Sequence, residues 1–335
     1  MNSIYSDYLL FEKDCIAPAD ITTKLSGYDR FISAFNSSER VCETFRLVRS
    51  NVAHWLIFPE YQIERDKLPT SGRSFEFGPS DEAEVILEYF GHEPVLPGEK
   101  LCIDVTGFLR PHLLFLIRYL YSINCQSIDL IYSEPEVYKK GSFTRFSSPI
   151  NEVRPVRGFE GCHTRPLDGD GEYLIVGCGY DSDSMHSVAN THKQAMKVQI
   201  FPFPPLRPHM YQENRLKTEQ CQAAFGRVVE QCFAPGYDPF ATAQALEKFI
   251  FTNILSIKNL YLTPLATKPQ VLGFAWFYLM SCIDMPVSIV FPMSSGYNHE
   301  TSTGLSEVWR YVMDFDLLKS IQPSHSFRWP SAKIV

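Results

Sequence analysis

The sequence predicts an α/β protein with a doubly wound, mostly parallel, Rossmann-like sheet and helices on both of its faces. Two observations lead to this fold class. Short apolar runs, each nearly continuous, alternate with segments whose apolar residues recur at helical spacing, which is the pattern of strands buried between two layers of helices. The chain also has 335 residues, 45% of them hydrophobic, which is enough for one large α/β domain or two smaller ones.

Apolar runs rich in β-branched and aromatic residues are expected to be strands. In chain order the eight runs are residues 30–35, 54–61, 100–105, 127–135, 172–181, 197–203, 259–265 and 287–293. Helical spacing of apolar residues, often after a polar capping residue, predicts helices between them. These cover residues 36–49, 80–90, 110–123, 182–195, 211–231, 238–254 and 268–281, and a last helix is expected from about residue 305 to residue 315, after a polar entry rich in Ser, Thr and Gly. Strands that alternate with helices in this way pair in parallel.

Two stretches of the chain share one local design. "DVTGFLRPHLLFLIRYL" (residues 104–120) and "TPLATKPQVLGFAWFYL" (residues 263–279) each run from a strand end through a turn to a basic residue, a proline and an apolar helix. The design is either an internal repeat or a βαβ solution reached twice. The chain is therefore interpreted as a single elaborated domain over residues 1–335, or as two pseudo-repeated lobes at about 28–205 and 206–335.

The basic residues of this design, Arg110 and Lys268, are candidates for binding an anion. Proline suits the first turn of a helix because its missing N–H needs no partner there. The free N–H groups and the helix dipole attract negative charge, and ligands of parallel sheets bind beyond the carboxyl ends of the strands. Thr106, Gly107 and Thr267 lie in the same turns and join the candidate ligand site. The plainer alternative is a well-capped core helix with a solvated basic residue.

The segment "VGCGYDSD" carries Gly177 and Gly179, half of a dinucleotide fingerprint whose third glycine is absent. Such a turn allows close approach by a ligand or by a neighbouring loop. Asp104, Glu134 and Asp181 fall at or near the carboxyl ends of predicted strands and are the candidate catalytic residues. Convergent carboxylates bind Mg²⁺ or do acid–base work, whereas single ones cap helices. No Cys/His cluster has metal-ligand spacing, so the sequence identifies neither a metal site nor a cofactor.

Charge and cysteine usage limit the classes of partner and compartment. The formal net charge is −7, so the surface as a whole is not a nucleic-acid footprint. Residues 139–165 are locally basic, with Arg145, Arg154 and Arg157, and carry aromatic rings; they suit a nucleotide or a single nucleic-acid strand, or form a solvated loop. Nine cysteines without framework spacing favour the cytoplasm. The longest apolar run, residues 271–283, is shorter than the roughly 20 residues that cross a bilayer.

The turn Thr106-Gly107 followed by Arg110, and less closely Thr267-Lys268, resembles the layout of Rossmann-like sensor domains in prokaryotic defence systems. CRISPR-associated Rossmann-fold (CARF) domains are the nearest example, and the resemblance covers about two βαβ units. It implies a protein that binds a small nucleotide or another phosphate-bearing ligand and has a sensing or regulatory role. Such a protein would act within a larger complex, with a protein partner or as a homo-oligomer.

Two further functions stay open at the level of sequence. A hydrolase or transferase that acts on nucleotides would use Asp104, Glu134 and Asp181, whereas a non-catalytic scaffold subunit would use the fold only to dock. The chain has no GxSxG elbow, no GxxxxGK[ST] loop and no HExxH helix. These absences argue against the serine hydrolases, P-loop NTPases and zinc proteases that depend on those motifs.

Overall fold

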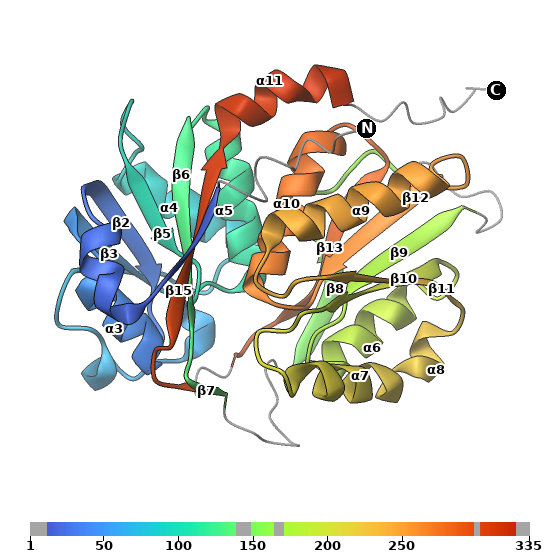
Figure 1. Cartoon of the computed structure of the whole chain (residues 1–335), viewed down its shortest axis with the longest axis horizontal. Coiled ribbons are helices and arrows are strands. Elements are labelled where there is room, and N and C mark those ends of the chain that lie inside the picture. Colours follow the sequence, from blue (N-terminus) through green and yellow to red (C-terminus); the bar gives the residue numbers. More distant parts are fainter. Residues whose placement is uncertain (1–11, 139–148, 164–170, 298–301, 326–335) are drawn as a thin grey trace. The chain divides into compact units, whose positions relative to one another are not determined.

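The computed structural model of the chain describes residues 12–138, 149–163, 171–297 and 302–325 (Figure 1). The chain divides into two compact units. Unit A consists of Leu10–Pro149 and Ser294–Asp316, and unit B is built on Ile150–Met293. Each unit has its own mostly parallel sheet with helices between the strands, so the predicted α/β fold class is confirmed.

The sheet of unit A consists, in spatial order, of β1 (Lys13–Ile16), β15 (Glu307–Asp314), β6 (Ser127–Glu134), β5 (Leu101–Asp104), β2 (Tyr28–Ala34), β3 (Ser50–Ile57) and β4 (Arg73–Glu76). The five strands from β6 to β4 are parallel. Strand β15 pairs antiparallel with β6, and β1 pairs antiparallel with β15. The helix expected over residues 305–315 is therefore wrong, because this segment is held as a strand by its pairing with β6 along its whole length. In Figure 1 the red strand β15 lies among blue and green strands, because the chain returns to unit A after it has built unit B.

The sheet of unit B consists, in spatial order, of β11 (Val228–Ala234), β10 (Met196–Pro202), β9 (Glu172–Gly177), β12 (Asn259–Pro264), β13 (Val287–Ser294) and β8 (Ile150–Pro155). The five strands from β11 to β13 are parallel. All eight strands predicted from the sequence are therefore present, and each belongs to the parallel part of one of the two sheets.

The parallel strands of the two sheets follow one order. The first of them in sequence, β2 or β9, is central, and the next two extend to one side of it. The fourth and fifth, β5 and β6 or β12 and β13, extend to the other side. The order therefore reverses between β2 and β5 in unit A, and between β9 and β12 in unit B. Open α/β sheets bind ligands beyond the carboxyl ends of the strands at such a switch point.

Helices cover both faces of the sheet in unit A. The Phe45 ring of α3 (Glu39–Leu47) stacks on Trp55 with 3.6 Å between ring centroids. On the other face, the Tyr89 hydroxyl of α4 (Glu82–His92) is hydrogen-bonded to His54 Nδ1 at 2.8 Å, and α4 packs against α5 (Arg110–Ser122). His54 and Trp55 are neighbours on β3, and neighbouring strand residues point to opposite faces.

The helices of unit B form two groups. They are α6 (Ser182–Thr191), α7 (Met210–Gln220) and α8 (Gln222–Phe225), and α9 (Pro239–Asn253) with α10 (Lys268–Ser281). The Arg215 guanidinium of α7 lies 4.6 Å from the centre of the Phe201 ring on β10. Phe274 of α10 lies instead against Gly177, which pairs with Ile200 of β10. Because Phe201 and Ile200 are neighbours on one strand, the two groups cover opposite faces.

Helix α10 accounts for the longest apolar run of the sequence. Its residues from Pro269 to Ser281 are all buried, and a helix that is apolar all round is a core helix. Among the residues that the structure describes, no helix has both the length and the apolar character that a membrane span requires.

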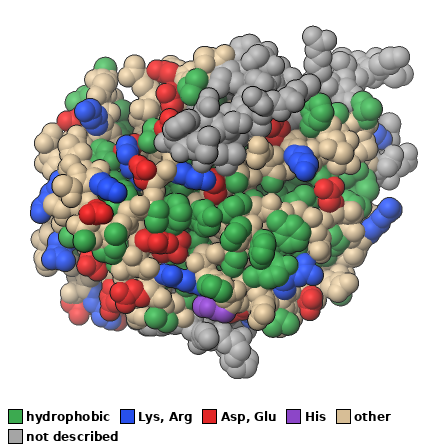
Figure 2. Space-filling view, viewed as in Figure 1, with side chains coloured by type: hydrophobic (Ala, Val, Ile, Leu, Met, Phe, Trp, Pro, Cys, Tyr) green, Lys and Arg blue, Asp and Glu red, His purple; other side chains and the backbone are tan. Residues whose placement is uncertain are grey.

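The remaining elements, apart from the 11-residue helix α11, are short. They are α2 (Ile21–Lys24), β7 (Val137–Tyr138), β14 (Ser302–Thr303), α11 (Phe315–His325) and the 3-10 turns Pro18–Asp20, Pro59–Tyr61 and Arg65–Lys67. Strands β7 and β14 pair antiparallel with each other. Basic and acidic side chains are interspersed over the face of the molecule seen in Figure 2, which agrees with a surface that is not basic as a whole.

The predicted helix over residues 211–231 is wrong at its end. Helix α8 stops at Phe225, and Val228 begins β11. This strand lies at the edge of the sheet, and Val229, Glu230 and Gln231 are exposed on it. An exposed edge strand does not need the continuous apolar run by which the buried strands were found.

The capping box of α4 confirms the predicted start of that helix and is open to a direct test. Asp81 Oδ1 accepts hydrogen bonds from the N–H groups of Ala83 and Glu84, both at 3.0 Å. We expect Asp81→Ala to lower the free energy of unfolding of unit A by about 1 kcal/mol, measured by urea denaturation. Ser80→Ala, which removes only a hydroxyl bonded to the Gly78 carbonyl, is the control, with an expected change below about 0.5 kcal/mol. Equal losses in the two variants would contradict the capping role.

Candidate functional site

The carboxyl ends of β2, β3, β5 and β6 meet at one edge of the unit A sheet because these strands are parallel. Helix α3 follows β2 and α5 follows β5, so both helices begin at this edge, beside the switch point. Four of the predicted site residues follow or end β5 here, and a fifth ends β6. They are Asp104, Thr106, Gly107, Arg110 and Glu134.

Gly107 lets two turns touch at the switch point. A Cβ atom built on Gly107 would lie 1.8 Å from the carbonyl oxygen of Ala34, the last residue of β2. The Gly107 carbonyl accepts a hydrogen bond of 2.7 Å from Tyr61 Oη. The close approach that requires a glycine here is therefore one between two segments of the same unit.

Asp104 and Thr106 tie three strand ends together. Asp104 is fully buried, and its carboxylate accepts hydrogen bonds from Ser33 Oγ at 3.1 Å and from Thr106 N at 2.9 Å. Thr106 Oγ1 accepts a hydrogen bond of 2.8 Å from Ser133 N. Since Ser33 belongs to β2 and Ser133 to β6, these two side chains link β2, β5 and β6. Hydrogen bonding of this kind stabilises a buried carboxylate without any ligand.

Glu134 lies on a neighbouring strand but points to the opposite face from Asp104. Asp104 pairs with Ile131, and Glu134 is an odd number of positions further along β6, so the alternation of side chains separates them. Glu134 is buried, and its Oε1 accepts a hydrogen bond of 2.9 Å from Trp309 Nε1 of β15.

Asp181, the third predicted carboxylate, belongs to unit B. It is the N-cap of α6, where it accepts hydrogen bonds from Ser184 N at 3.1 Å and Ser184 Oγ at 2.9 Å. The three candidate catalytic carboxylates therefore have three different local surroundings. Within the described ranges, no group of three His, Cys, Asp or Glu side chains is arranged to hold a metal ion.

Arg40, in the first turn of α3, belongs to the carboxyl edge although the sequence prediction did not include it. Its Nη1 donates a hydrogen bond of 2.8 Å to the Ser133 carbonyl, and its guanidinium carbon lies 5.8 Å and 5.9 Å from the ring centres of Tyr132 and Tyr138. Burial opposes the charged form, but the two tyrosines and Asp104 outweigh it and raise the pKa of Arg40. Its Nε is buried and has no hydrogen-bond partner within the part of the chain described.

Arg110 is the first residue of α5 and is followed by proline, as the sequence predicts. Tyr61 connects it to Arg40. Burial raises the pKa of Tyr61 to about 12, while a hydrogen bond with Asn36 and the charges of Arg110 and Arg40 act in the opposite direction. Both guanidinium groups therefore lie within electrostatic reach of the Tyr61 hydroxyl, at the switch point.

Two turns also touch at the switch point of unit B. Here the glycine follows the first parallel strand and the carbonyl follows the fourth, whereas in unit A the glycine follows the fourth and the carbonyl ends the first. A Cβ atom on Gly179, in the turn after β9, would lie 2.0 Å from the carbonyl oxygen of Leu265, in the turn after β12. The side-chain amide of Asn214 donates to the carbonyls of Cys178 at 2.7 Å and Gly179 at 2.9 Å. The glycine turn that resembles a dinucleotide fingerprint, from Gly177 onward, is therefore packed and hydrogen-bonded by other residues of unit B.

Helix α10 begins at Lys268 with proline in the second position, again as predicted. Thr267 is its N-cap, and its Oγ1 accepts a hydrogen bond from Gln270 N at 3.4 Å. Lys268 is half-buried. Arg110 and Lys268 thus occupy equivalent positions, each at the start of the helix that follows the fourth parallel strand of its unit.

The basic segment 139–165 is described only from residue 149 to residue 163. Arg154 pairs there with Glu152, with 3.1 Å between Nε and Oε1, and Arg157 lies in a turn after β8. Arg145 lies outside the described residues.

The signal that identified Arg110 would also have found Arg40, because each is a basic residue in the first turn of a helix that follows a parallel strand. Tyr61 and Tyr138 carry no such local signal, since they reach the edge from other segments. No protein-family model matches the chain, and no curated protein matches it either.

The contact at Gly107 can be tested by adding a methyl group. We expect Gly107→Ala to lower the free energy of unfolding of unit A by about 2 kcal/mol or more, because its Cβ would overlap the Ala34 carbonyl. Gly91→Ala is the matched control: Gly91 lies in α4 with nothing within 4 Å of its Cβ position. That variant should gain about 0.5–1 kcal/mol. Urea denaturation measures both, and an unchanged stability of Gly107→Ala would overturn the proposed contact.

Proposed function

We propose that unit A binds a small phosphate-bearing ligand, with nucleotides as the foremost class, at the carboxyl edge of its sheet. The role of this binding is sensing or regulation. The observation that carries the proposal is the presence of two arginines, Arg40 and Arg110, at one switch point. Each stands in the first turn of a helix at the switch point, and both lie within electrostatic reach of Tyr61.

The chemistry of these groups suits a phosphate. Guanidinium groups match phosphate oxygens with two parallel hydrogen bonds. The helices that begin at Glu39 and Arg110 add the partial positive charge of their N-termini. Arg40 also keeps a buried Nε that has no hydrogen-bond partner within the described residues, and a ligand oxygen would satisfy it. Buried polar groups are otherwise hydrogen-bonded in nearly all cases.

The two switch points differ in their basic residues, which supports unit A as the site. The surroundings of the carboxylates support binding as its role. Within the described residues, the two helices that begin at the switch point of unit B, α6 and α10, carry one basic residue in their first turns, Lys268, whereas α3 and α5 of unit A carry Arg40 and Arg110. Asp104 is enclosed by hydrogen bonds within unit A, and Asp181 caps a helix. These roles favour ligand binding over acid–base chemistry by the carboxylates. We place such a sensor in a prokaryotic defence complex, as the CARF-type resemblance implies.

Isothermal titration calorimetry of the full chain tests the proposal with ATP, a cyclic dinucleotide and inorganic phosphate as probes. We expect at least one probe to bind, and Arg40→Ala and Arg110→Ala each to weaken it about tenfold or more, because a hydrogen bond to a charged group contributes about 1.5–3 kcal/mol. Arg46→Ala is the matched control, since Arg46 lies in the last turn of α3 with its side chain 75% exposed. Its affinity should equal that of the wild type.

Two results would reject this site. One is the failure of all three probes to bind the wild type at millimolar concentration. The other is binding that is equally tight in both arginine variants. Arg40→Lys distinguishes charge from geometry: it keeps the cation and loses the planar fork, so its affinity should fall between those of the wild type and Arg40→Ala. Circular dichroism of each variant checks that it is folded.

A further inference from the structure

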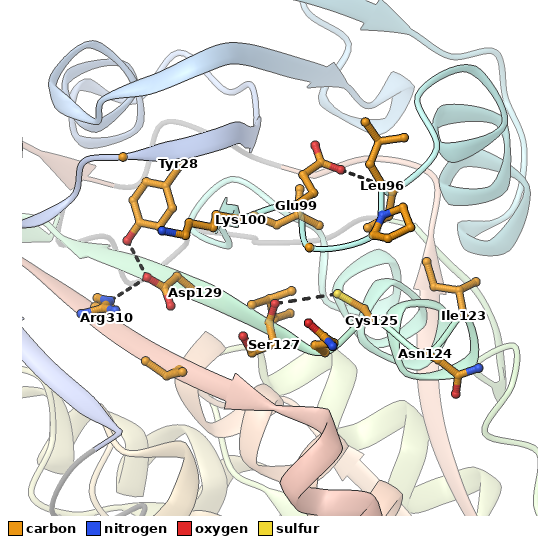
Figure 3. Close-up of a pocket in the computed structure, with 18 of the residues that line it drawn as sticks. Tyr28, Leu96, Glu99, Lys100, Ile123, Asn124, Cys125, Ser127, Asp129 and Arg310 are labelled. Carbon is orange, nitrogen blue, oxygen red and sulfur yellow. Dashed lines mark hydrogen bonds and ion pairs between the residues drawn. The ribbon is translucent and has the colours of Figure 1, made fainter.

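A cavity of about 790 Å³ opens at the amino edge of the unit A sheet, the edge opposite to the candidate site (Figure 3). The first residues of three parallel strands line it: Tyr28 of β2, Leu101 of β5 and Ser127 of β6. The loops that precede these strands and two residues of β15 complete its wall. Its volume falls within the range of about 300–1,000 Å³ that is typical of small-molecule sites.

The carboxylates of this cavity are already neutralised. Asp129 Oδ2 accepts hydrogen bonds from Tyr28 Oη at 2.5 Å and from Arg310 Nε at 2.8 Å. Glu99 pairs with Arg30, with 2.7 Å between Oε1 and Nε and 2.7 Å between Oε2 and Nη2. Each acidic side chain in the wall thus faces a guanidinium, and neither is available to attract a cation from solution.

The two lysines of the cavity are not neutralised in this way. Lys24 and Lys100 both line the wall and are exposed. Within the described residues, neither ammonium group forms an ion pair, and Figure 3 shows Lys100 pointing toward Tyr28. Three basic residues of the lining, Lys24, Lys100 and Arg310, face two acidic ones, Asp129 and Glu99. Arg310 is shared between Asp129 and Asp14, so the two lysines are the cations of the wall that remain for a ligand.

Apolar side chains gather at the other end of the same cavity. Leu96 is 60% exposed and Ile123 is 38% exposed. In Figure 3 they stand on the side away from Tyr28, Asp129 and Arg310. Pro97 and Val95 extend the apolar lining. The cavity therefore has a cationic, hydrogen-bonding end and an apolar end.

We propose that this amino-edge cavity is a second ligand site, which binds a small amphipathic anion with its head group at Lys24 and Lys100 and its apolar part against Leu96 and Ile123. The head group is a carboxylate or a phosphate ester, since a lysine ammonium is a point charge that donates hydrogen bonds to either. The site is separate from the carboxyl edge, where helix N-termini and arginines would bind a nucleotide. It neither requires that site nor competes with it.

Calorimetry of the full chain with octanoate, octyl phosphate and the neutral analogue octanol, all below their micellar concentrations, tests the proposal. We expect saturable binding of at least one anion and none of octanol. The double variant Lys24→Gln, Lys100→Gln should weaken binding of the anion about tenfold or more, because it removes both cations that would bind the head group. Leu96→Ser should weaken the octyl anions without creating any affinity for octanol. The preferred anion identifies the head group as a carboxylate or a phosphate.

Lys193→Gln is the matched control, because Lys193 is an exposed lysine of unit B that lies outside the cavity wall. Its affinity should match the wild type. The proposal is overturned if neither anion binds, if octanol binds as well as the anions, or if the double lysine variant keeps the wild-type affinity. It is also overturned if Lys193→Gln loses as much affinity as the double variant, since general surface charge would then explain binding. Arg110→Ala should leave this binding unchanged, which separates its outcome from that of the carboxyl-edge test.

Discussion

A glycine pressed against a facing carbonyl holds the switch point of each unit together. In unit A the glycine is Gly107 and the carbonyl belongs to Ala34, whereas in unit B Gly179 meets the carbonyl of Leu265. A side chain at either glycine would force the two turns apart. The two strands that lead into these turns in unit A are parallel, so the helices that follow begin at one edge of the sheet. Arg40 and Arg110 lie in the first turns of those helices, beside a backbone contact that involves neither of them.

The two units share this closure but use it differently. In unit B, the side-chain amide of Asn214 donates to the carbonyls of Cys178 and Gly179, which ties the glycine turn to α7. In unit A, Arg40 is held by the Ser133 carbonyl and by two tyrosine rings. Its Nε has no hydrogen-bond partner within the described residues and can still donate. Arg110 and Lys268 thus start equivalent helices, and within the described first turns at the two switch points unit A has a second basic residue, Arg40. Similar topology does not by itself imply similar function.

The sequence predicted the features of this structure that depend on adjacent residues, and it missed those that depend on residues far apart in the chain. The buried parallel strands and the starts of α5 and α10 follow from apolar runs and from proline at a helix start, and both signals are contained in a few adjacent residues. The edge strand β11 was missed because its exposed residues lack the apolar run. The return of β15 to unit A has no local signal, yet it brings Arg310 to Asp129 across 181 positions of sequence. The rule that identified Arg110, a basic residue in the first turn of a helix after a parallel strand, also predicts Arg40. It does not predict Tyr132 and Tyr138, which contact Arg40 from other segments.

The two edges of the unit A sheet can hold anions only by different means. At the carboxyl edge, the N-termini of α3 and α5 add their dipoles to Arg40 and Arg110. At the amino edge α4 and α5 end, and the partial negative charge of a helix C-terminus disfavours an anion. An anion there must be held by side-chain charge, and Lys24 and Lys100 are exposed. Salt screens exposed charges more than buried ones, so we expect the proposed binding at the amino edge to depend on ionic strength more strongly than the proposed binding at the carboxyl edge.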